Sequence, residues 1–501
     1  MPMPDALVFL HGWSVTSTDT YGGLPERLAA ELSAGGRPLP QHALHLGRYV
    51  SFHDEVRMED LARAMQAALQ RELGGLIAQG KRFAMITHST GGPLAREWWW
   101  RFHAEPRDAA PCPMSHLIML APANFGSALA QLGKGRLSRL KSLTQGVEPG
   151  AGVLDWLEQG SPEAWTLNEA WIRGRFGVPG GDDGRGVYPI VLTGQRIDRK
   201  LYDHLNSYTG ELGSDGVVRV PSTNLNSALL SLEQGRSGND RLLVPVGAMK
   251  RAPQTAFRLI AGAAHSGKAH GILRSVEAQP GGQGGQVVDA ILRSLAVETP
   301  AQYADLVQRF ADDTAAIQQA EQIEIEPVPV LPDRVYVHDR SSLVIFRVRD
   351  SEGHALADFD LLLTGLNDSP DLLPEGFLRD RQRNSRMRST LSLFFNHDLM
   401  AGSEALADPR DPSCALRVRH PGIDRLGLHL RPRPEHGFVH FRAGAIHADP
   451  KLLRQAIRPN ETTLIDIRLR RCVDREVFAL DQASAGPRSF AKLKLAGEEL
   501  P

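Results

Sequence analysis

The sequence predicts an α/β fold, in which helices cover both faces of a mostly parallel sheet, followed by a β-sandwich. Short apolar, β-prone runs alternate with helical segments up to about residue 322, and this alternation is typical of parallel strands joined by helical crossovers. Beyond residue 334, β-prone segments follow one another between Gly, Pro, Asn and Asp turns, with no helical pattern between them. That second pattern is typical of a two-sheet sandwich.

The first part begins with a strand and then alternates helix and strand. The predicted strands are Ala6–Leu10, Phe83–Thr87, His116–Leu120, Tyr188–Leu192 and Phe257–Ile260. The predicted helices are Leu24–Leu32, Asp60–Leu73, Thr90–His103, Val288–Leu295 and Ala301–Ala320. In the second of these helices, Leu61, Met65 and Leu69 recur at helical spacing and mark the face that should be buried.

The chain is predicted to have two domains and a linker. Residues 1–322 form the α/β domain with an insertion around 128–186, residues 323–333 are a linker of alternating charge and prolines, and residues 334–501 form the sandwich. The insertion contains several tryptophans and is longer than a crossover needs. It is either a lid or an accessory helical layer with buried tryptophans. The predicted sandwich strands are Leu343–Val348, Phe359–Leu363, Thr390–Phe395, Leu416–Val418, Leu426–Leu430, Phe438–Phe441 and Thr463–Leu469.

Composition and charge exclude several functions. The 501 residues are 42% hydrophobic and 23% charged, which is ordinary for a globular protein, and the net charge is −1. A nearly neutral chain argues against a nucleic-acid partner. Cys112, Cys414 and Cys472 lie far apart, so neither a disulfide framework nor a zinc site is indicated. No metal-binding motif or dinucleotide-binding turn is present, and we expect neither a metal nor a cofactor.

The N-terminal segment predicts where the chain is made. Met1–Asp5 lacks the basic segment and the cleavage site of a secretory signal, and no apolar run is long enough to cross a bilayer. We therefore expect a chain made in the cytoplasm as a soluble protein, without a signal peptide. Export, if it occurs, would use a route that needs no cleaved leader.

A serine lies at the apex of a predicted strand–turn–helix. The strand Phe83–Thr87 runs into His88-Ser89-Thr90, and a helix follows at once. This arrangement is the nucleophile elbow of α/β-hydrolases, which forces the hydroxyl clear of the sheet. Thr87 replaces the first glycine of the usual pattern, while Gly91 and Gly92 provide room on the helix side. The alternative is a serine in an ordinary turn.

A serine nucleophile needs a base and an acid, which follow it in the chain order Ser, acid, His. Asp215, in a tight turn before a small β-prone run, is the preferred acid, with Asp198 and Asp203 as rivals. Two histidines follow the last predicted strand of the sheet. His270, which precedes Gly-Ile-Leu, is slightly preferred as the base over His265.

The tetrahedral intermediate of acyl transfer needs two backbone donors for its oxyanion. The amide of Thr90, next to the serine, should be one of them, and the amide of Trp13, in the loop after the first strand, should be the other. His88 also adjoins the nucleophile. Because neighbours in an elbow point apart, we expect His88 to pack rather than to take part in catalysis.

Taken together, these segments resemble the lipase branch of the α/β-hydrolase superfamily. The resemblance covers about residues 5–297 and rests on His11-Gly12, Thr87–Gly91, Ala121–Ser127, Ser214–Val218 and His265–Leu273, in the family's order. It implies a serine lipase, phospholipase or carboxylesterase that cleaves lipid esters through a Ser–Asp–His triad and an acyl-enzyme. The alternatives are a short-chain cytoplasmic carboxylesterase and a non-catalytic binding protein on a hydrolase scaffold, against which the intact Ser, acid, His order argues.

The domain architecture carries a second resemblance. A lipase without a leader joined to a β-rich domain is similar to the phospholipase toxins that bacterial type VI contractile secretion machines deliver. This implies a secretion machine and an immunity protein as partners, beside peripheral contact with a membrane. The basic stretch Arg379–Arg388 is expected to be a solvated loop rather than a site for anionic headgroups.

Overall fold

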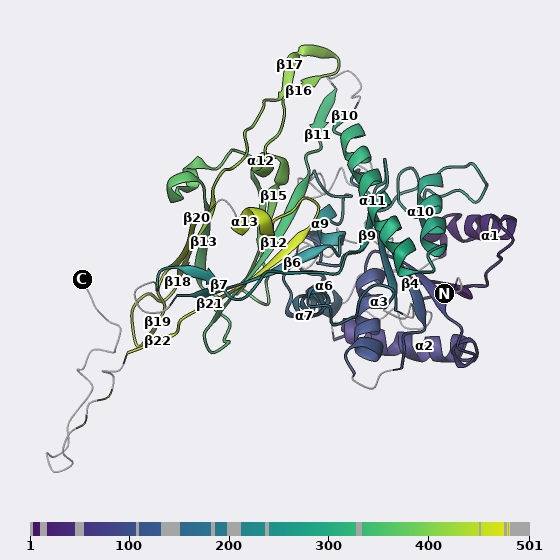
Figure 1. Cartoon of the computed structure of the whole chain (residues 1–501), viewed down its shortest axis with the longest axis horizontal. Helices are drawn as coiled ribbons and strands as arrows, with labels where there is room; N and C mark the ends of the chain where they lie inside the picture. The colour runs from purple at the N-terminus through teal and green to yellow at the C-terminus, as the bar shows by residue number, and fades with distance from the viewer. Residues whose placement is uncertain are drawn as a thin grey trace.

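The computed structural model has two parts that lie side by side, an α/β part and a β-rich part (Figure 1). The residues that it describes are 4–10, 18–45, 55–106, 110–131, 151–181, 186–197, 212–235, 240–326, 333–449, 452–474, 478 and 480.

The first sheet is parallel throughout, as the alternation of strands and helices predicts. Its strands occur in the order β2-β1-β3-β4-β5-β9, and every neighbouring pair is parallel. Their bounds are β1 Ala6–Leu10, β2 Gln41–Leu44, β3 Phe83–His88, β4 Met114–Leu120, β5 Tyr188–Thr193 and β9 Ala256–Leu259. Strands β1, β4 and β5 are buried along their whole length, because helices cover both faces of the sheet.

Two hydrophobic clusters hold these helices on the sheet. One face carries α2 (Met58–Ala78) and α3 (Gly91–Trp99), and the other carries α1 (Leu24–Ala34), α10 (Gly285–Leu295) and α11 (Pro300–Ala320). Successive residues of a strand alternate between the two clusters, as the period of two requires. Helix α3 continues into a short π-helix, Trp100–Ala104. The predicted α/β-hydrolase fold is therefore confirmed for this part.

A buried histidine in β4 makes stability depend on pH. His116 is 2% exposed, and burial lowers its pKa to about 4. The folded protein keeps this ring neutral, so only the unfolded chain takes up a proton as the pH falls below about 6.5. The full contribution is present above that pH and is lost progressively as the pH falls toward 4. At about 1.4 kcal/mol per tenfold difference in proton affinity, the expected loss is about 3 kcal/mol.

Urea unfolding of the wild type and His116→Gln at pH 7 and at pH 4.5 measures this effect. We expect the free energy of unfolding to fall less with pH in the variant, whatever its stability at pH 7. His397, whose pKa burial also lowers to about 4, stays unchanged in both proteins and cancels in the comparison. Equal pH dependence in the two proteins would contradict the assignment.

The second part is a β-sandwich, as predicted. Its larger sheet has the order β14-β15-β12-β21-β6-β7, with β8 also paired to β6, and its smaller sheet has the order β13-β18-β20. The larger sheet consists of β6 Ser227–Gln234, β7 Leu243–Pro245, β8 Lys250–Arg251, β12 Ser341–Asp350, β14 Leu378–Arg383, β15 Thr390–Asn396 and β21 Thr462–Leu469. The smaller one consists of β13 Phe359–Thr364, β18 Leu426–Pro432 and β20 Gly444–Asp449. One cluster of leucine, isoleucine, valine and phenylalanine fills the space between the sheets.

Short elements complete the two parts. Three small antiparallel pairs are β10 Ile323–Glu326 with β11 Arg334–Val337, β16 Leu406–Asp408 with β17 Asp411–Arg417, and β19 Val439–His440 with β22 Cys472–Val473. Apart from the helices of the insertion, the remaining short helices are η1 Thr18–Tyr21, α9 Val220–Thr223, η3 Leu366–Asp368, η4 Pro370–Leu372, α12 His397–Ala401 and α13 Leu452–Ala456. Strand β10 lies inside the predicted linker, so part of that linker is a strand. Within the ranges given above, no helix combines the length and apolar character needed to cross a bilayer.

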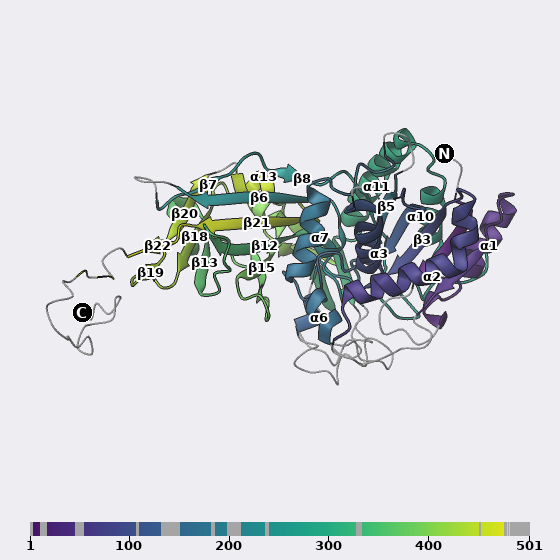
Figure 2. The ribbon, with the colours of Figure 1, turned by 90° about the horizontal axis from the view of Figure 1, so that it is seen from below.

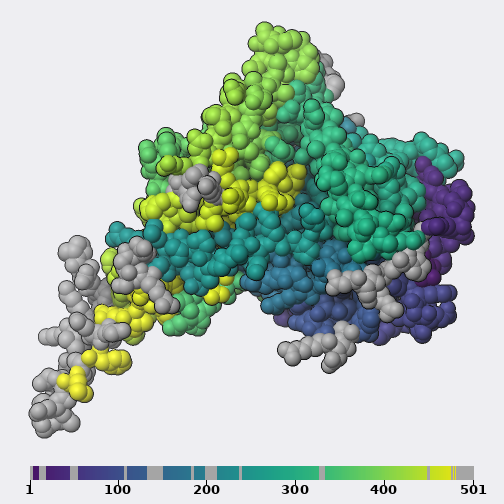
Figure 3. All heavy atoms as spheres, viewed as in Figure 1, coloured from purple at the N-terminus to yellow at the C-terminus, as the bar shows by residue number. Residues whose placement is uncertain are grey.

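Strands β6, β7 and β8 precede the predicted linker in the sequence but belong to the sandwich. Strand β6 pairs in parallel with β21 over seven positions, from Ser227 opposite Thr462 to Glu233 opposite Arg468. Figure 3 shows the teal atoms of this segment beside the yellow atoms of the C-terminal strands. The segment 227–251 was expected within the α/β domain, so the larger sheet of the sandwich takes strands from both sides of the linker.

The insertion forms a helical layer between the parallel sheet of the α/β part and the larger sheet of the sandwich. Its helices α6 (Ala151–Leu157) and α7 (Pro162–Ile172) lie between α3 and the strands of the sandwich (Figure 2). Trp156 and Trp171 belong to the core of the α/β part, whereas Trp165 packs with sandwich residues. Residues 151–172 therefore match the reading as an accessory helical layer. Residues 132–150, on which the lid reading also rests, lie outside the described residues.

Candidate active site

Ser89 lies at the end of β3 in a strained backbone conformation. Its φ is +53°, in the left-handed region that residues with a side chain rarely adopt. Gly92 makes the turn possible, because a Cβ at this position would lie 2.6 Å from Cβ of Pro122. Thr87, which departs from the usual pattern, is fully buried within the strand. The predicted strand–turn–helix is therefore present, with the crowding relieved on its helix side.

The hydroxyl of Ser89 lies within hydrogen-bonding distance of His265, which in turn contacts Asp215. Nε2 of His265 is 3.0 Å from Ser89 Oγ, and Nδ1 of His265 is 2.9 Å from Asp215 Oδ2. The backbone amide of His265 also donates to the carbonyl of Asp215 at 2.9 Å. Three side chains from three distant segments thus form a continuous chain of polar contacts.

The sequence slightly favours His270 over His265 as the base, but the structure places His265 between Ser89 and Asp215. The loop after β9 folds back on itself, with the Ala264 amide donating to the His270 carbonyl and the Ile272 amide to the Ala264 carbonyl. This places His265 at the end of the loop that faces Asp215 and Ser89, and His270 at the return. His270 is half-buried and makes neither contact of the triad geometry.

Asp215 is fixed by its own turn. It is fully buried, and its Oδ1 accepts hydrogen bonds from the amides of Val217 and Val218 at 3.0 and 2.8 Å. One carboxylate oxygen is thus held by the turn, and the other faces His265. A carboxylate held in this way can orient the imidazole that it faces. The rivals Asp198 and Asp203 lie outside the described residues.

His88 makes a contact that the sequence alone does not predict. Its Nε2 lies 3.1 Å from the carbonyl oxygen of His265, and the two rings lie 4.9 Å apart at 45°. His88 therefore packs, as expected, but it packs on the histidine that faces Ser89. Its position directly before Ser89 was the signal in the sequence that His88 lies near the site. The contact with His265 depends on the fold.

One of the two predicted oxyanion donors lies among the described residues. Thr90 precedes the first residue of α3 and is 7% exposed, and within the described part of the chain its amide donates to no acceptor. A free amide directly after the serine is the arrangement that an oxyanion hole needs. Trp13, the second predicted donor, lies outside the described residues.

A buried cation joins α3 to the loop that follows β4. Arg96 is 1% exposed, donates to Oδ1 of Asn124 at 3.2 Å and lies 6.0 Å from the ring centroid of Trp171. Burial lowers its pKa to about 9, so the guanidinium remains charged at neutral pH. The arginine therefore ties the helix behind Ser89 to the adjoining loop and to α7.

The sandwich contacts the turn that carries Asp215. Gly213 has φ +86°, and a Cβ there would lie 2.6 Å from Ser341 Oγ of β12. Arg219, 1% exposed, forms an ion pair with Asp380 of β14 and lies 4.4 Å from the ring centroid of Phe394. Strand β14 of the sandwich thus contacts the turn that carries Asp215. It includes the start of the stretch Arg379–Arg388, which was expected to be a solvated loop.

Breaking this ion pair should destabilise the protein strongly. Asp380→Ala leaves the Arg219 guanidinium buried without its carboxylate, which typically costs about 3–5 kcal/mol. The matched control is Glu233→Ala, which removes the partner of Arg468 in an ion pair of the same sheet whose side chains are 43% and 49% exposed. Its cost should stay below about 1 kcal/mol. Urea unfolding measures both, and equal losses would contradict a structural role for the buried pair.

Comparison with known proteins adds two close matches over the whole length. The phospholipase PlaB from Legionella pneumophila is 40% identical to this chain, covers 97% of it and 98% of its own chain, and superposes with a TM-score of 0.83. The same protein in complex with thio-NAD is 39% identical over 97% of both chains, with a TM-score of 0.82. No protein-family model and no curated protein sequence matches the chain.

Proposed function

The chain belongs to the family of the phospholipase PlaB, an α/β-hydrolase family, and from this membership we propose that it hydrolyses carboxylic ester bonds of phospholipids with Ser89 as the nucleophile. The general class is that of a serine ester hydrolase acting on lipids. Similarity along the whole chain, sandwich included, supports a phospholipid as the substrate rather than a small soluble ester.

The observation that carries the proposal is the continuous contact from Asp215 through His265 to Ser89. A serine hydroxyl is a weak nucleophile until a base accepts its proton. His265 lies 3.0 Å from that hydroxyl, and its other ring nitrogen faces a buried carboxylate. Asp215 would hold the ring in the tautomer that leaves Nε2 free to accept a proton, and it would stabilise the imidazolium that forms.

In the first half of the reaction, Oγ of Ser89 attacks the carbonyl carbon of the ester while its proton passes to Nε2 of His265. The negative charge that develops on the carbonyl oxygen is stabilised by the amide of Thr90 and, as the sequence predicts, by that of Trp13. The tetrahedral intermediate collapses to an acyl-enzyme. The alcohol, here a lysophospholipid, leaves with the proton from His265.

In the second half, water attacks the acyl-enzyme. His265 accepts a proton from this water and returns it to Oγ of Ser89 when the fatty acid is released. Asp215, held by the amides of Val217 and Val218, orients the ring of His265 through both halves. These roles make Ser89, His265 and Asp215 the proposed triad.

The test is the release of fatty acid from vesicles of phosphatidylethanolamine and phosphatidylglycerol, measured beside hydrolysis of p-nitrophenyl esters of increasing chain length. We expect release from vesicles in the wild type and none above background in Ser89→Ala. Serine-dependent hydrolysis of short soluble esters alone would establish the alternative, a short-chain carboxylesterase. No serine-dependent hydrolysis of any substrate would favour the non-catalytic alternative.

The other expectations stay predictions. Delivery by a contractile secretion machine, an immunity protein and peripheral contact with a membrane rest on the resemblance in domain architecture. Vesicle co-sedimentation of Ser89→Ala measures the membrane contact separately from hydrolysis, because the variant binds without consuming the lipid.

A further inference from the structure

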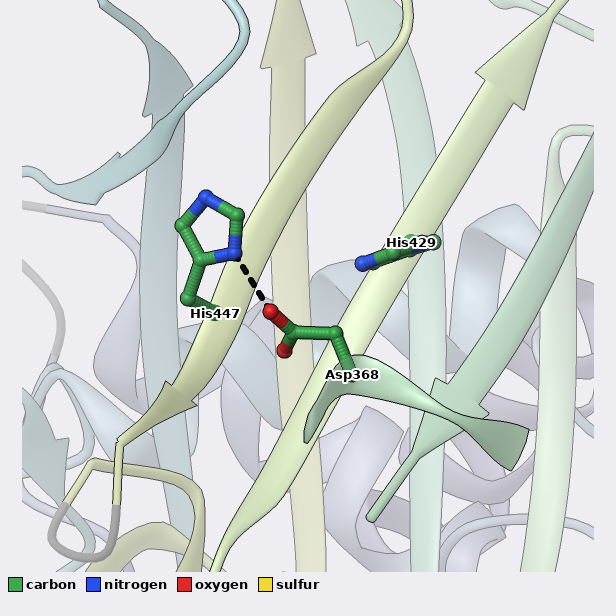
Figure 4. Close-up of side chains that lie close together, drawn as sticks. All are labelled: Asp368, His429 and His447. Carbon is green, nitrogen blue, oxygen red and sulfur yellow. Dashed lines mark hydrogen bonds and ion pairs between the residues drawn. The ribbon is translucent and has the colours of Figure 1, made fainter. Parts of the chain in front are cut away.

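Three side chains with metal-binding groups meet on the sandwich, in a part of the fold that the reaction does not use. They are His429 of β18, His447 of β20 and Asp368 of η3 (Figure 4). The ligand atoms that they offer lie within 4.8 Å of one another. The smaller sheet lies at the end of the molecule away from α3 and the first sheet (Figures 1 and 2).

The two histidines project from the face of the smaller sheet that does not pack against the larger one. Leu428 and Leu430 are fully buried in the core between the sheets, so His429 between them points to the opposite face. Ile446 also belongs to that core, which places His447 on the same outer face as His429. The two residues come from neighbouring antiparallel strands, β18 and β20.

The carboxylate comes from the segment that follows β13. Helix η3 lies against β18 and β20, and its last residue, Asp368, has φ +55°. Oδ2 of Asp368 is 2.7 Å from Nδ1 of His447. Figure 4 shows the carboxylate beside both rings, with a nitrogen of His429 directed toward it.

An unsatisfied nitrogen points to a missing ligand. Nε2 of His429 is buried, and it has no hydrogen-bond partner among the described residues. Other buried nitrogen and oxygen atoms of the described residues also lack a partner, but this nitrogen lies within 4.8 Å of a ligand atom of Asp368 and of one of His447, and an ion held between the three would satisfy it.

We propose that Asp368, His429 and His447 bind a zinc ion, with water in the fourth position. Two imidazoles and one carboxylate are nitrogen and oxygen ligands that suit zinc and related transition metals. Calcium and magnesium instead require six or more oxygen ligands, most of which these three residues cannot supply. No redox change is involved, and the ion acts as a cross-link.

The geometry allows closure around the ion. Tetrahedral zinc with bonds of about 2.0–2.1 Å places its ligands about 3.3 Å apart, so the present contact of 2.7 Å must open and the widest separation must shorten. His447 can move, because its side chain is 66% exposed. His429 is held by its strand and sets the position of the ion.

The ion would join three segments that are distant in the sequence. The segment after β13 would be fixed to β18 and to β20, which closes the outer face of the smaller sheet. The three ligands are scattered along the sequence, which explains why no sequence motif marks this site. The site lies apart from Ser89, so ester hydrolysis should not depend on it.

The experiment measures zinc binding by the full-length protein, after treatment with a chelator, by equilibrium dialysis and by the visible absorption of bound Co²⁺. His447→Gln is the main variant, because an exposed side chain can be replaced without loss of the fold. The matched control is His354→Gln, since His354 also lies beside a carboxylate, 3.6 Å from Glu352, but belongs to no three-ligand group found in the described residues.

We expect the wild type and His354→Gln to bind one more equivalent of zinc than His447→Gln at micromolar concentrations. The affinity of that site should fall at least about 100-fold in His447→Gln and also in Asp368→Asn. Zinc should raise the Tm of the wild type but not that of His447→Gln. Equal binding by the wild type and His447→Gln, or no saturable binding by the wild type, would overturn the proposal.

Discussion

Replacing Ser89 by alanine is expected to lower kcat for ester hydrolysis by about 10⁴–10⁶-fold, the range observed when the nucleophile of a triad is removed. The variant keeps His265 and Asp215 but has no oxygen that can form the acyl-enzyme. A loss of this size corresponds to about 5–8 kcal/mol of transition-state stabilisation at about 1.4 kcal/mol per tenfold change. Steady-state hydrolysis of a p-nitrophenyl ester measures it.

The left-handed backbone of Ser89 provides a check on folding. Alanine at φ +53° has no greater steric difficulty than serine, so the variant should unfold at nearly the wild-type urea concentration. Labelling by a fluorophosphonate should be lost together with activity. Hydrolysis by Ser89→Ala within about tenfold of the wild-type rate would exclude Ser89 as the nucleophile.

The second large effect separates the two histidines of the loop after β9. We expect His265→Ala to lower kcat by about 10⁴–10⁶-fold, because it removes the only ring placed between Ser89 and Asp215 in the described residues. His270→Ala should stay within about tenfold of the wild type. The same ester assay compares the two variants, and each substitution removes one imidazole ring.

A large loss in His270→Ala with a small loss in His265→Ala would show that the loop rearranges before the reaction, with His270 moving to Ser89. Similar losses in both variants would instead indicate that the loop as a whole was disturbed. Thermal unfolding distinguishes this case, since a disturbed loop should lower Tm in both. The small loss in His270→Ala and the large one in His265→Ala together support the triad as proposed.

The turn that carries Ser89, the proposed nucleophile, could be predicted from the sequence because its signal is local. The apolar strand, the serine and the glycines follow one another within a few residues, and Gly92 is required by its contact with Pro122. Asp215 was also predictable, since its tight turn supplies the two amides that hold its carboxylate. Both features depend on neighbours in the sequence, and sequence patterns describe such neighbours well.

The choice of histidine could not be made in the same way. His265 and His270 lie five positions apart in one loop, and the difference between them depends on how that loop folds back between Ala264 and Gly271. The contact of His88 with the His265 carbonyl is likewise a meeting of distant segments. Sequence spacing measures distance along the chain, and these contacts are made across it.

The strands also divide into those that the local sequence predicts and those that depend on distant partners. Some strands form where the sequence predicts them, such as Ala6–Leu10 and Tyr188–Thr193. Their apolar content alone requires burial. Strand β6 has an equally apolar pattern, but its sheet is chosen by β21, which lies more than two hundred residues later. The tryptophans of the insertion were predicted to be buried or to form a lid, and only the position of both sheets assigns α6 and α7 to a shared layer.

The course of the chain through β6, β7 and β8 limits how this protein can have been assembled. The chain leaves the first sheet after β5, passes Asp215, contributes β6, β7 and β8 to the sandwich and returns through β9 to His265. Asp215 and His265, the proposed acid and base, therefore lie at the two ends of one excursion into the other domain. The sandwich is not a module that recombination could add behind a finished hydrolase. An exchange of residues 334–501 between relatives would pair foreign strands with a native β6, so the excursion and the C-terminal strands must be inherited together.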